Sequence, residues 1–201
     1  MTRRSSLAFT ISLALAAAGF AAAAQDHGAA PPSGHGAPSA PSAEKNPYGA
    51  YSFLIGEWNV APEAGGAPLG VMRFKWGPNR SYVWISMSML QDGKEEPHFE
   101  GLLVWNGVKK NLDMLLAVDL SNGLVQEQGT VSVSEDGTVV REITMLGGER
   151  AGGRPGTTAH FRQTFKATAP DRVLTNAMRK TEKGWTATFP GSDKLVMTRR
   201  A

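Results

Sequence analysis

The sequence predicts an all-β protein, an antiparallel meander of about ten strands closed into a barrel. The first sign is a series of turn-forming dipeptides at regular intervals: Asp92-Gly93, Asn106-Gly107, Asn122-Gly123 and Asp136-Gly137. Their glycines are 14, 16 and 14 residues apart. Each interval holds one strand of about ten residues and leaves no room for a crossover helix, so consecutive strands must be antiparallel.

The second sign is that apolar side chains alternate along these strands. A two-residue Asn-Gly turn fixes which residues face each other. It predicts Trp105 opposite Val108 across the first Asn-Gly turn and Leu116 opposite Gly129 across the second. Both turns then place the apolar residues of three strands on one face: Phe99, Leu103, Trp105, Leu112, Met114, Leu116, Val118, Leu120, Val125, Val131 and Val133.

The turn at Asp136-Gly137 decides where Arg141 points. A two-residue turn would bury Val140 and expose Arg141 to solvent. A three-residue loop, Glu135 to Gly137 with a left-handed glycine, would bury Ile143 and send Arg141 inward. We prefer the three-residue loop on its apolar pattern, and the two-residue turn stays open.

The third sign is that the remaining breaks are also short. They fall at Gly77-Pro78-Asn79, Pro170-Asp171, Lys183-Gly184 and Pro190-Gly191, while Gly147 to Gly156 forms a glycine-rich loop. Residues 48–54 could form one helical turn. Closure into a barrel removes exposed sheet edges, and ten strands enclose a space for a small molecule. A two-sheet sandwich is the alternative, but it needs longer connections.

Three segments are expected along the chain. Residues 1–24 have a cationic start and an apolar stretch typical of a cleaved signal peptide, although an uncleaved anchor is the alternative. Residues 25–46 contain 15 Ala, Pro, Gly or Ser in 22 positions and are expected to be a disordered linker. Residues 47–201 form the barrel domain. The protein is then periplasmic or secreted, and the signal does not distinguish Sec from twin-arginine export.

Composition excludes several functions. The chain of 201 residues has 21 Lys+Arg and 18 Asp+Glu. Without Arg3 and Arg4 of the leader the balance is 19 to 18, which disfavours a nucleic-acid partner. The absence of cysteine excludes disulfides, thiolate zinc sites and cysteine nucleophiles. His27 and His35 in the linker, and Met87 with Met89, are poor metal sites, so we expect neither metal nor cofactor.

The segment Leu54-x-Gly56-x-Trp58 resembles the opening of calycins, the superfamily of lipocalins and fatty-acid-binding proteins. It is most similar to bacterial calycin-like exported proteins of unknown function that end on a strand with Thr-Arg, here Thr198-Arg199. The resemblance implies a barrel end closed by Trp58 beneath Arg199 or Arg200, a structural feature. The absence of cysteine separates the chain from disulfide-bearing secreted lipocalins.

Five residues are candidate ligand contacts: Arg141, Gln163, Trp105, Met114 and Met87. An interior arginine, as in fatty-acid-binding proteins, would hold a carboxylate. Glu127 falls on the core face but close enough to a turn that we expect it to reach water. His98 and Glu100 are expected to point outward, so no catalytic residue is assigned.

The expected function is therefore an exported barrel that binds a small lipophilic molecule, and an acidic one if Arg141 points inward. No stable membrane insertion is expected after signal cleavage. An envelope enzyme using the cavity for acid/base or isomerase chemistry is one alternative, and an inward acid/base pair would favour it. A protein-interaction module is the other, and a large exposed apolar patch would favour that.

Overall fold

The computed structural model describes residues 46–120, 123–146 and 158–200. The predicted signal peptide, nearly all of the predicted linker, Asn122 and the glycine-rich loop lie outside the described residues. Within them the chain forms twelve strands and two short 3-10 helices. No helix among these residues is long and apolar enough to cross a membrane.

The first half of the domain contains both helices and six of the strands. They are η1 (Gly49–Leu54), β1 (Gly56–Pro62), β2 (Gly70–Trp76), η2 (Pro78–Arg80), β3 (Val83–Gln91), β4 (Lys94–Asn106), β5 (Asn111–Leu120) and β6 (Gly123–Val133). The second half is entirely β-structure. It contains β7 (Val139–Leu146), β8 (Thr158–Ala169), β9 (Arg172–Thr175), β10 (Met178–Thr181), β11 (Gly184–Ala187) and β12 (Leu195–Arg199).

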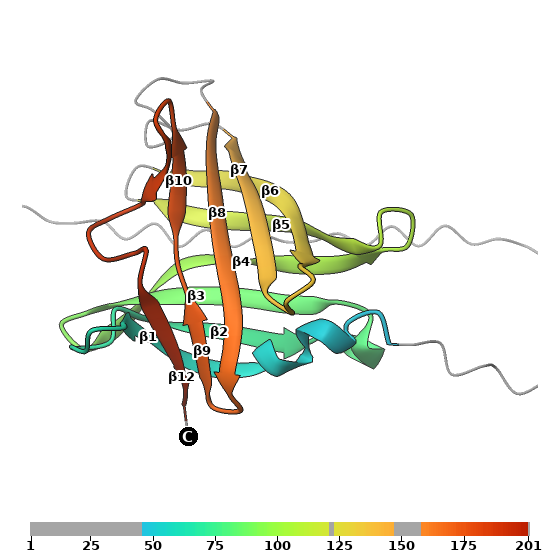
Figure 1. Cartoon of the computed structure of the whole chain (residues 1–201), viewed down its shortest axis with the longest axis horizontal. Helices are drawn as coiled ribbons and strands as arrows, with labels where there is room; N and C mark the ends of the chain where they lie inside the picture. Colours follow the sequence, from blue (N-terminus) through green and yellow to red (C-terminus); the bar gives the residue numbers. More distant parts are fainter. Residues whose placement is uncertain (1–45, 121–122, 147–157, 201) are drawn as a thin grey trace, which may run out of the picture. The chain divides into compact units, whose positions relative to one another are not determined.

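Ten of the strands close into an antiparallel barrel. Strands β1 to β8 pair in sequence order, then β8 pairs with β9, β9 with β12, and β12 with β1. Strands β10 and β11 form a hairpin that extends the sheet from another part of β8 (Figure 1). The predicted fold class, a closed antiparallel meander of about ten strands, is confirmed.

The two Asn-Gly turns differ from the predicted register. At the first, the Asn106 side chain accepts hydrogen bonds from the backbone N–H groups of Val108 and Lys109. Lys110 adopts a left-handed φ of 54°. This longer turn pairs Trp105 with Leu112 instead of Val108. The local hydrogen bonds of asparagine thus compete successfully with a two-residue hairpin.

At the second Asn-Gly dipeptide, Gly123 belongs to β6 and pairs with Leu120. Leu116 therefore faces Glu127 instead of Gly129. Both register errors are even numbers of residues, and side chains alternate with a period of two. The predicted core face survives for most of its residues, although Val133 at the end of β6 is exposed.

The third turn confirms the preferred prediction. Val133 pairs with Val139, Ser134 N–H donates to the Thr138 carbonyl, and Gly137 has a φ of +79°. Glu135 to Gly137 therefore form a three-residue loop. Arg141, like Ile143, points inward and is 3% exposed.

A bulge interrupts β4 at His98. Met87 pairs with Phe99 and Ser88 pairs with Pro97, which leaves His98 as an extra residue. Bulges redirect side chains. The expectation that His98 points outward is wrong, because it lines the interior cavity described below.

One end of the barrel is closed by Trp58 and Arg199. Trp58 is fully buried, pairs with Arg199 and donates from its indole nitrogen to the Leu54 carbonyl. The Arg199 guanidinium lies 4.3 Å from the ring. Gly56 has a φ of +135°, and a Cβ there would collide with Arg199 Nη1. The Gly-x-Trp pattern therefore has a physical basis at this end.

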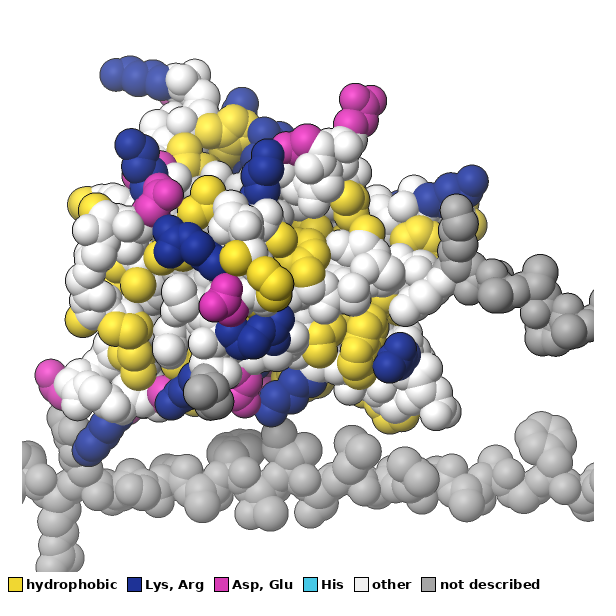
Figure 2. Space-filling view, turned by 60° about the horizontal axis from the view of Figure 1, so that its bottom comes forward, with side chains coloured by type: hydrophobic (Ala, Val, Ile, Leu, Met, Phe, Trp, Pro, Cys, Tyr) yellow, Lys and Arg dark blue, Asp and Glu magenta, His cyan; other side chains and the backbone are white. Residues whose placement is uncertain are grey.

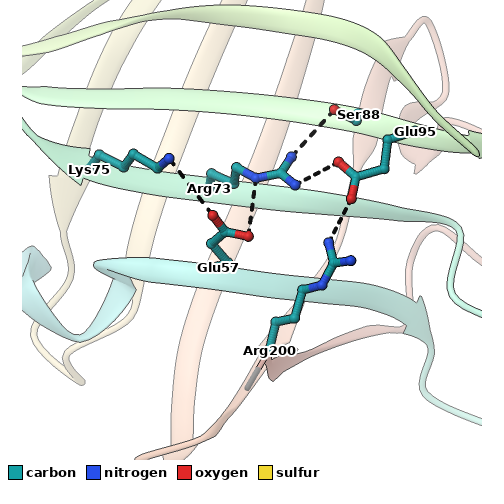
Figure 3. Close-up of polar contacts among 6 residues, drawn as sticks. All are labelled: Glu57, Arg73, Lys75, Ser88, Glu95 and Arg200. Atoms are coloured by element: carbon teal, nitrogen blue, oxygen red, sulfur yellow. Dashed lines mark hydrogen bonds and ion pairs between the residues drawn. The ribbon is translucent and has the colours of Figure 1, made fainter.

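One face of the barrel carries charges of both signs. On the face in Figure 2, basic and acidic side chains are interspersed with apolar ones. Figure 3 shows one network, in which Glu95 accepts hydrogen bonds from Arg73 and Arg200, both at 2.6 Å. Arg73 also lies 3.3 Å from Glu57, which Lys75 approaches at 3.8 Å. These pairs connect β1, β2, β4 and the chain after β12.

Candidate functional site

A cavity of about 870 Å³ lies inside the barrel, away from the Trp58 closure. Several exposed residues line it, including Gln91 and Glu96 of the β3–β4 hairpin and Phe189 after β11. The cavity therefore reaches solvent at this end. Its size is within the usual range for sites that bind small molecules.

The walls are largely apolar. Methionine, aromatic and branched side chains from six of the barrel strands surround the space: Met72, Met87, Met89, Phe99, Val118, Ile143, Met145 and Phe161. Methionine and aromatic side chains are large and polarisable, and methionine adapts its shape to what it contacts. Such walls suit a hydrocarbon or an aromatic ring better than a polar solute.

Three polar residues interrupt these walls on neighbouring strands. Glu127 lies on β6, Arg141 on β7 and Gln163 on β8, with Arg141 and Gln163 directly paired. All three are buried, at 7%, 3% and 9% exposure respectively. Gln163 Nε2 lies 3.5 Å from the hydroxyl of buried Thr175. The barrel therefore holds a short polar row against one wall of an apolar cavity.

Arg141 and Glu127 form an ion pair without a hydrogen bond. Their closest atoms, Nη2 and Oε2, are 3.7 Å apart, beyond hydrogen-bonding distance. The guanidinium lies 4.9 Å from the centre of the Phe99 ring. Among the described residues, Arg141 Nε and Nη1 and Glu127 Oε2 have no hydrogen-bond partner. Buried charged groups are normally satisfied, so these atoms are an unusual feature of the interior.

Burial determines the electrostatics of this pair. Desolvation raises the pKa of Glu127, and the nearby Arg141 charge only partly opposes this effect. Desolvation also lowers the pKa of Arg141, which nevertheless remains protonated at neutral pH as arginines do in proteins. The site thus holds a permanent cation beside a carboxyl group that gives up its proton reluctantly.

The structure brings together three of the five predicted contact residues. Arg141, Gln163 and Met87 line the cavity. Trp105 and Met114 are not among its described lining residues. Met114 is buried in the main core, and the Trp105 backbone N–H donates to the Tyr48 hydroxyl in the closed half of the barrel.

Two lining residues were expected to point toward solvent instead of the cavity. Glu127 was expected to reach water, but with Gly123 already in β6 it lies four residues into the strand and is buried. His98 was expected outside, and the bulge turns it in. Pro97 could have signalled this, since proline inside a strand usually marks an edge or a bulge.

Within the described ranges, no group of three or more His, Cys, Asp or Glu side chains is arranged to hold a metal ion. Trp185 of β11 is covered by two cations, Arg162 at 4.6 Å and Lys180 at 5.4 Å from the ring centre. Arg162 also pairs with Glu142.

Comparisons with known proteins find likeness among solved structures. No family model and no curated protein matches the chain. Among solved structures, the crystal structure of Rv2717c from M. tuberculosis is similar at 17% identity, over 77% of this chain and 98% of that one, with a TM-score of 0.43.

Proposed function

We propose that this protein is an exported, calycin-like barrel that binds a small lipophilic molecule in its interior cavity. The observation that carries the proposal is an apolar cavity of about 870 Å³ whose wall presents a buried arginine, Arg141, two of whose nitrogen atoms have no hydrogen-bond partner among the described residues. An apolar ligand body would replace water against the methionine and aromatic walls. A polar group on the ligand would reach Arg141.

The size and shape of the site support a ligand instead of a packing defect. Burying apolar surface releases about 25 cal/mol per Å², so a medium-chain lipophile gains several kcal/mol from the walls alone. Leaving guanidinium donors unpaired costs about 1–3 kcal/mol, a cost that a ligand acceptor would remove. Both terms favour occupation of the cavity.

The calycin-like and exported parts of the proposal have separate support. The geometry at Trp58, Gly56 and Arg199 matches what the resemblance to calycins implied for the closed end. Export is supported by the cationic and apolar pattern of residues 1–24. Cleavage would be detected as the N-terminal sequence of the protein recovered from its own cells.

Ligand binding can be tested with Nile red, an uncharged dye that fluoresces in apolar surroundings. Titration of the folded protein should give saturable fluorescence that decanamide displaces. Met87→Trp, which places an indole in the cavity, should abolish the signal. Val104→Trp is the matched control, because Val104 is exposed on the outer face. Equal fluorescence from both variants would refute binding inside the barrel.

A second function is favoured by one observation, the buried Glu127 carboxyl whose pKa is raised beside the cavity. Such a carboxylate is a suitable general base. In an isomerase reaction it would remove a proton from the carbon next to a ligand carbonyl and return it to another carbon. Arg141 would stabilise the negative charge that forms on the carbonyl oxygen.

The two functions make different predictions for the fate of a bound ligand. Isomerase chemistry requires that a bound β,γ-unsaturated ketone be converted into its conjugated isomer, which is followed by the ultraviolet absorbance of the conjugated ketone. Glu127→Gln should stop this conversion while leaving Nile red binding intact. Binding without any conversion by the unmodified protein would leave ligand carriage as the function.

A further inference from the structure

We infer that the cavity selects a lipophile with a neutral head group that carries a hydrogen-bond acceptor and a donor bonded to the same carbon, and that Glu127 enforces this choice against carboxylate anions. A carboxamide and an undissociated carboxylic acid are the simplest such groups. The inference rests on the proposed function, because it concerns the ligand of the same cavity.

Arg141 and Glu127 offer opposite hydrogen-bonding groups to a ligand. Arg141 offers only donors, and its Nε and Nη1 have no partner among the described residues. Glu127 Oε2, also unpartnered there, is an acceptor when ionised. A head group that satisfies both must accept from the guanidinium and donate to the carboxylate. A carboxylate anion only accepts, so it would leave Glu127 unsatisfied.

The distance between the two residues also suits one small head group. Nη2 and Oε2 are 3.7 Å apart, too far for their own hydrogen bond but near enough for one small group to contact both. An amide oxygen facing Arg141 would place its N–H₂ group toward Glu127. The protein therefore presents two complementary halves of one recognition site.

The net charge of the Arg141–Glu127 pair also disfavours a carboxylate anion. The Arg141–Glu127 pair is neutral as a whole and more than nine-tenths buried. A carboxylate would add a second negative charge to a low-dielectric site, next to the first. It could enter only with a proton, carried on the ligand or on Glu127. The raised pKa of Glu127 favours this uptake.

The other charged and titratable residues that line the cavity do not supply an alternative to this pair. Glu96 is exposed. Arg162 Nε also has no hydrogen-bond partner among the described residues, but the charge of Arg162 is paired with that of Glu142. His98 and Arg179 also line the cavity and have interactions of their own. Among the described residues, Arg141 is the charged group that acts on Glu127. The selectivity is therefore assigned to these two side chains.

The test compares three ligands of equal chain length, decanamide, decanoate and decanol, by displacement of Nile red at pH 7.5. The unmodified protein should bind decanamide at least about tenfold more tightly than decanoate, the effect of leaving one buried charge unsatisfied. Calorimetry in two buffers of different ionisation enthalpy should show uptake of about one proton with decanoate and none with decanamide.

The deciding variant is Glu127→Gln, which keeps the shape and removes the negative charge. It should bind decanoate about tenfold more tightly than the unmodified protein does, because Arg141 becomes an uncompensated cation. Glu96→Gln is the matched control, since Glu96 also lines the cavity but lies exposed at its rim. It should leave the preference unchanged.

The outcomes separate this inference from the proposed function. Preference for decanoate over decanamide by the unmodified protein, or an unchanged preference in Glu127→Gln, would overturn the inference while leaving ligand binding intact. Failure of all three ligands and of Nile red to bind would refute the proposed function itself. The comparison in unmodified protein needs no variant, so it stands even if Glu127→Gln does not fold.

Discussion

Arg199 and Arg141 are two of the arginines of this barrel that lie over aromatic rings, and they differ in how their donor groups are satisfied. The Arg199 guanidinium is 4.3 Å from Trp58, and Arg141 is 4.9 Å from Phe99. Arg199 donates hydrogen bonds to the carbonyls of Phe53, Ile55 and Pro170. For Arg141, by contrast, Nε and Nη1 have no partner among the described residues.

Comparing Arg199 with Arg141 shows how a structural arginine can be distinguished from one that binds a ligand. Stacking on a ring is common to both and identifies neither. What separates them is satisfaction of the donors: Arg199 joins the start of β1 to the end of β12, while Arg141 keeps its donors directed at a cavity. A buried charge that the protein leaves unsatisfied lowers stability, and a ligand can recover that cost.

The largest effect on stability is expected from Arg199→Met. It removes a cation over an indole and four charge-assisted hydrogen bonds to three carbonyls, so the free energy of unfolding should fall by about 2–3 kcal/mol. Urea denaturation measures this change. Nile red affinity of the folded variant should remain that of the unmodified protein. A loss below about 0.5 kcal/mol would contradict the closure role.

The opposite result is expected at the other arginine. Replacing the buried pair together, as Arg141→Met with Glu127→Leu, removes two desolvated charges from an apolar surrounding. Such replacements are neutral or stabilise proteins by about 1–4 kcal/mol. The same denaturation measurement should therefore show unchanged or higher stability, with weaker ligand binding. Destabilisation comparable to that of Arg199→Met would mean that the pair is structural.

The pH dependence of stability should also differ between the interior and the outside. The pKa of Glu127 is higher in the folded protein than in the unfolded chain. The contribution of Glu127 to the free energy of unfolding is therefore fully present below its pKa in the unfolded chain, about 4.3. It is lost as the pH rises through the pKa in the folded protein. Each pKa unit is worth about 1.4 kcal/mol. Subtracting the stability profile of Glu127→Gln from that of the unmodified protein should show this fall. A flat difference would contradict it.

The smallest effect is expected from the surface network of Figure 3. Hydrogen bonds from Arg200 and then Arg73 lower the pKa of Glu95. The contribution of Glu95 to the free energy of unfolding is therefore present above its pKa in the unfolded chain. It is lost as the pH falls through its pKa in the folded protein, which is the reverse of the behaviour of Glu127. Arg200→Ala should cost less than about 1 kcal/mol, and added salt should reduce the difference. A loss as large as that of Arg199→Met would overturn this ranking.

Much of the fold followed from the sequence because strand alternation tolerates certain errors. The predicted registers at Asn106 and Gly123 were wrong by four and two residues, and an even shift keeps every side chain on its face. Turn chemistry was harder to predict, since asparagine side chains choose among several local hydrogen bonds. The three-residue loop at Gly137 was predicted correctly because its alternative would have exposed Ile143.

The site was predicted less completely, and for a physical reason. The inward direction of Arg141 followed from the length of one loop. The burial of its neighbour Glu127 depended on the register at Gly123, and the predicted register there was wrong by two residues. The direction of the His98 side chain depends on a bulge, which interrupts the alternation of side chains between the two faces of the strand. Nothing in the sequence pattern measures the distance between side chains on different strands, so the Arg141–Glu127 pair required the structure.

Native mass spectrometry with decanamide tests the central claim most directly, applied to the unmodified protein and to Arg141→Met. The unmodified protein should retain one molecule of decanamide, and Arg141→Met should lose it while keeping the charge-state distribution of a folded barrel. Equal retention by both proteins, or no retention by either, would contradict the assignment of Arg141 as the residue that holds the ligand.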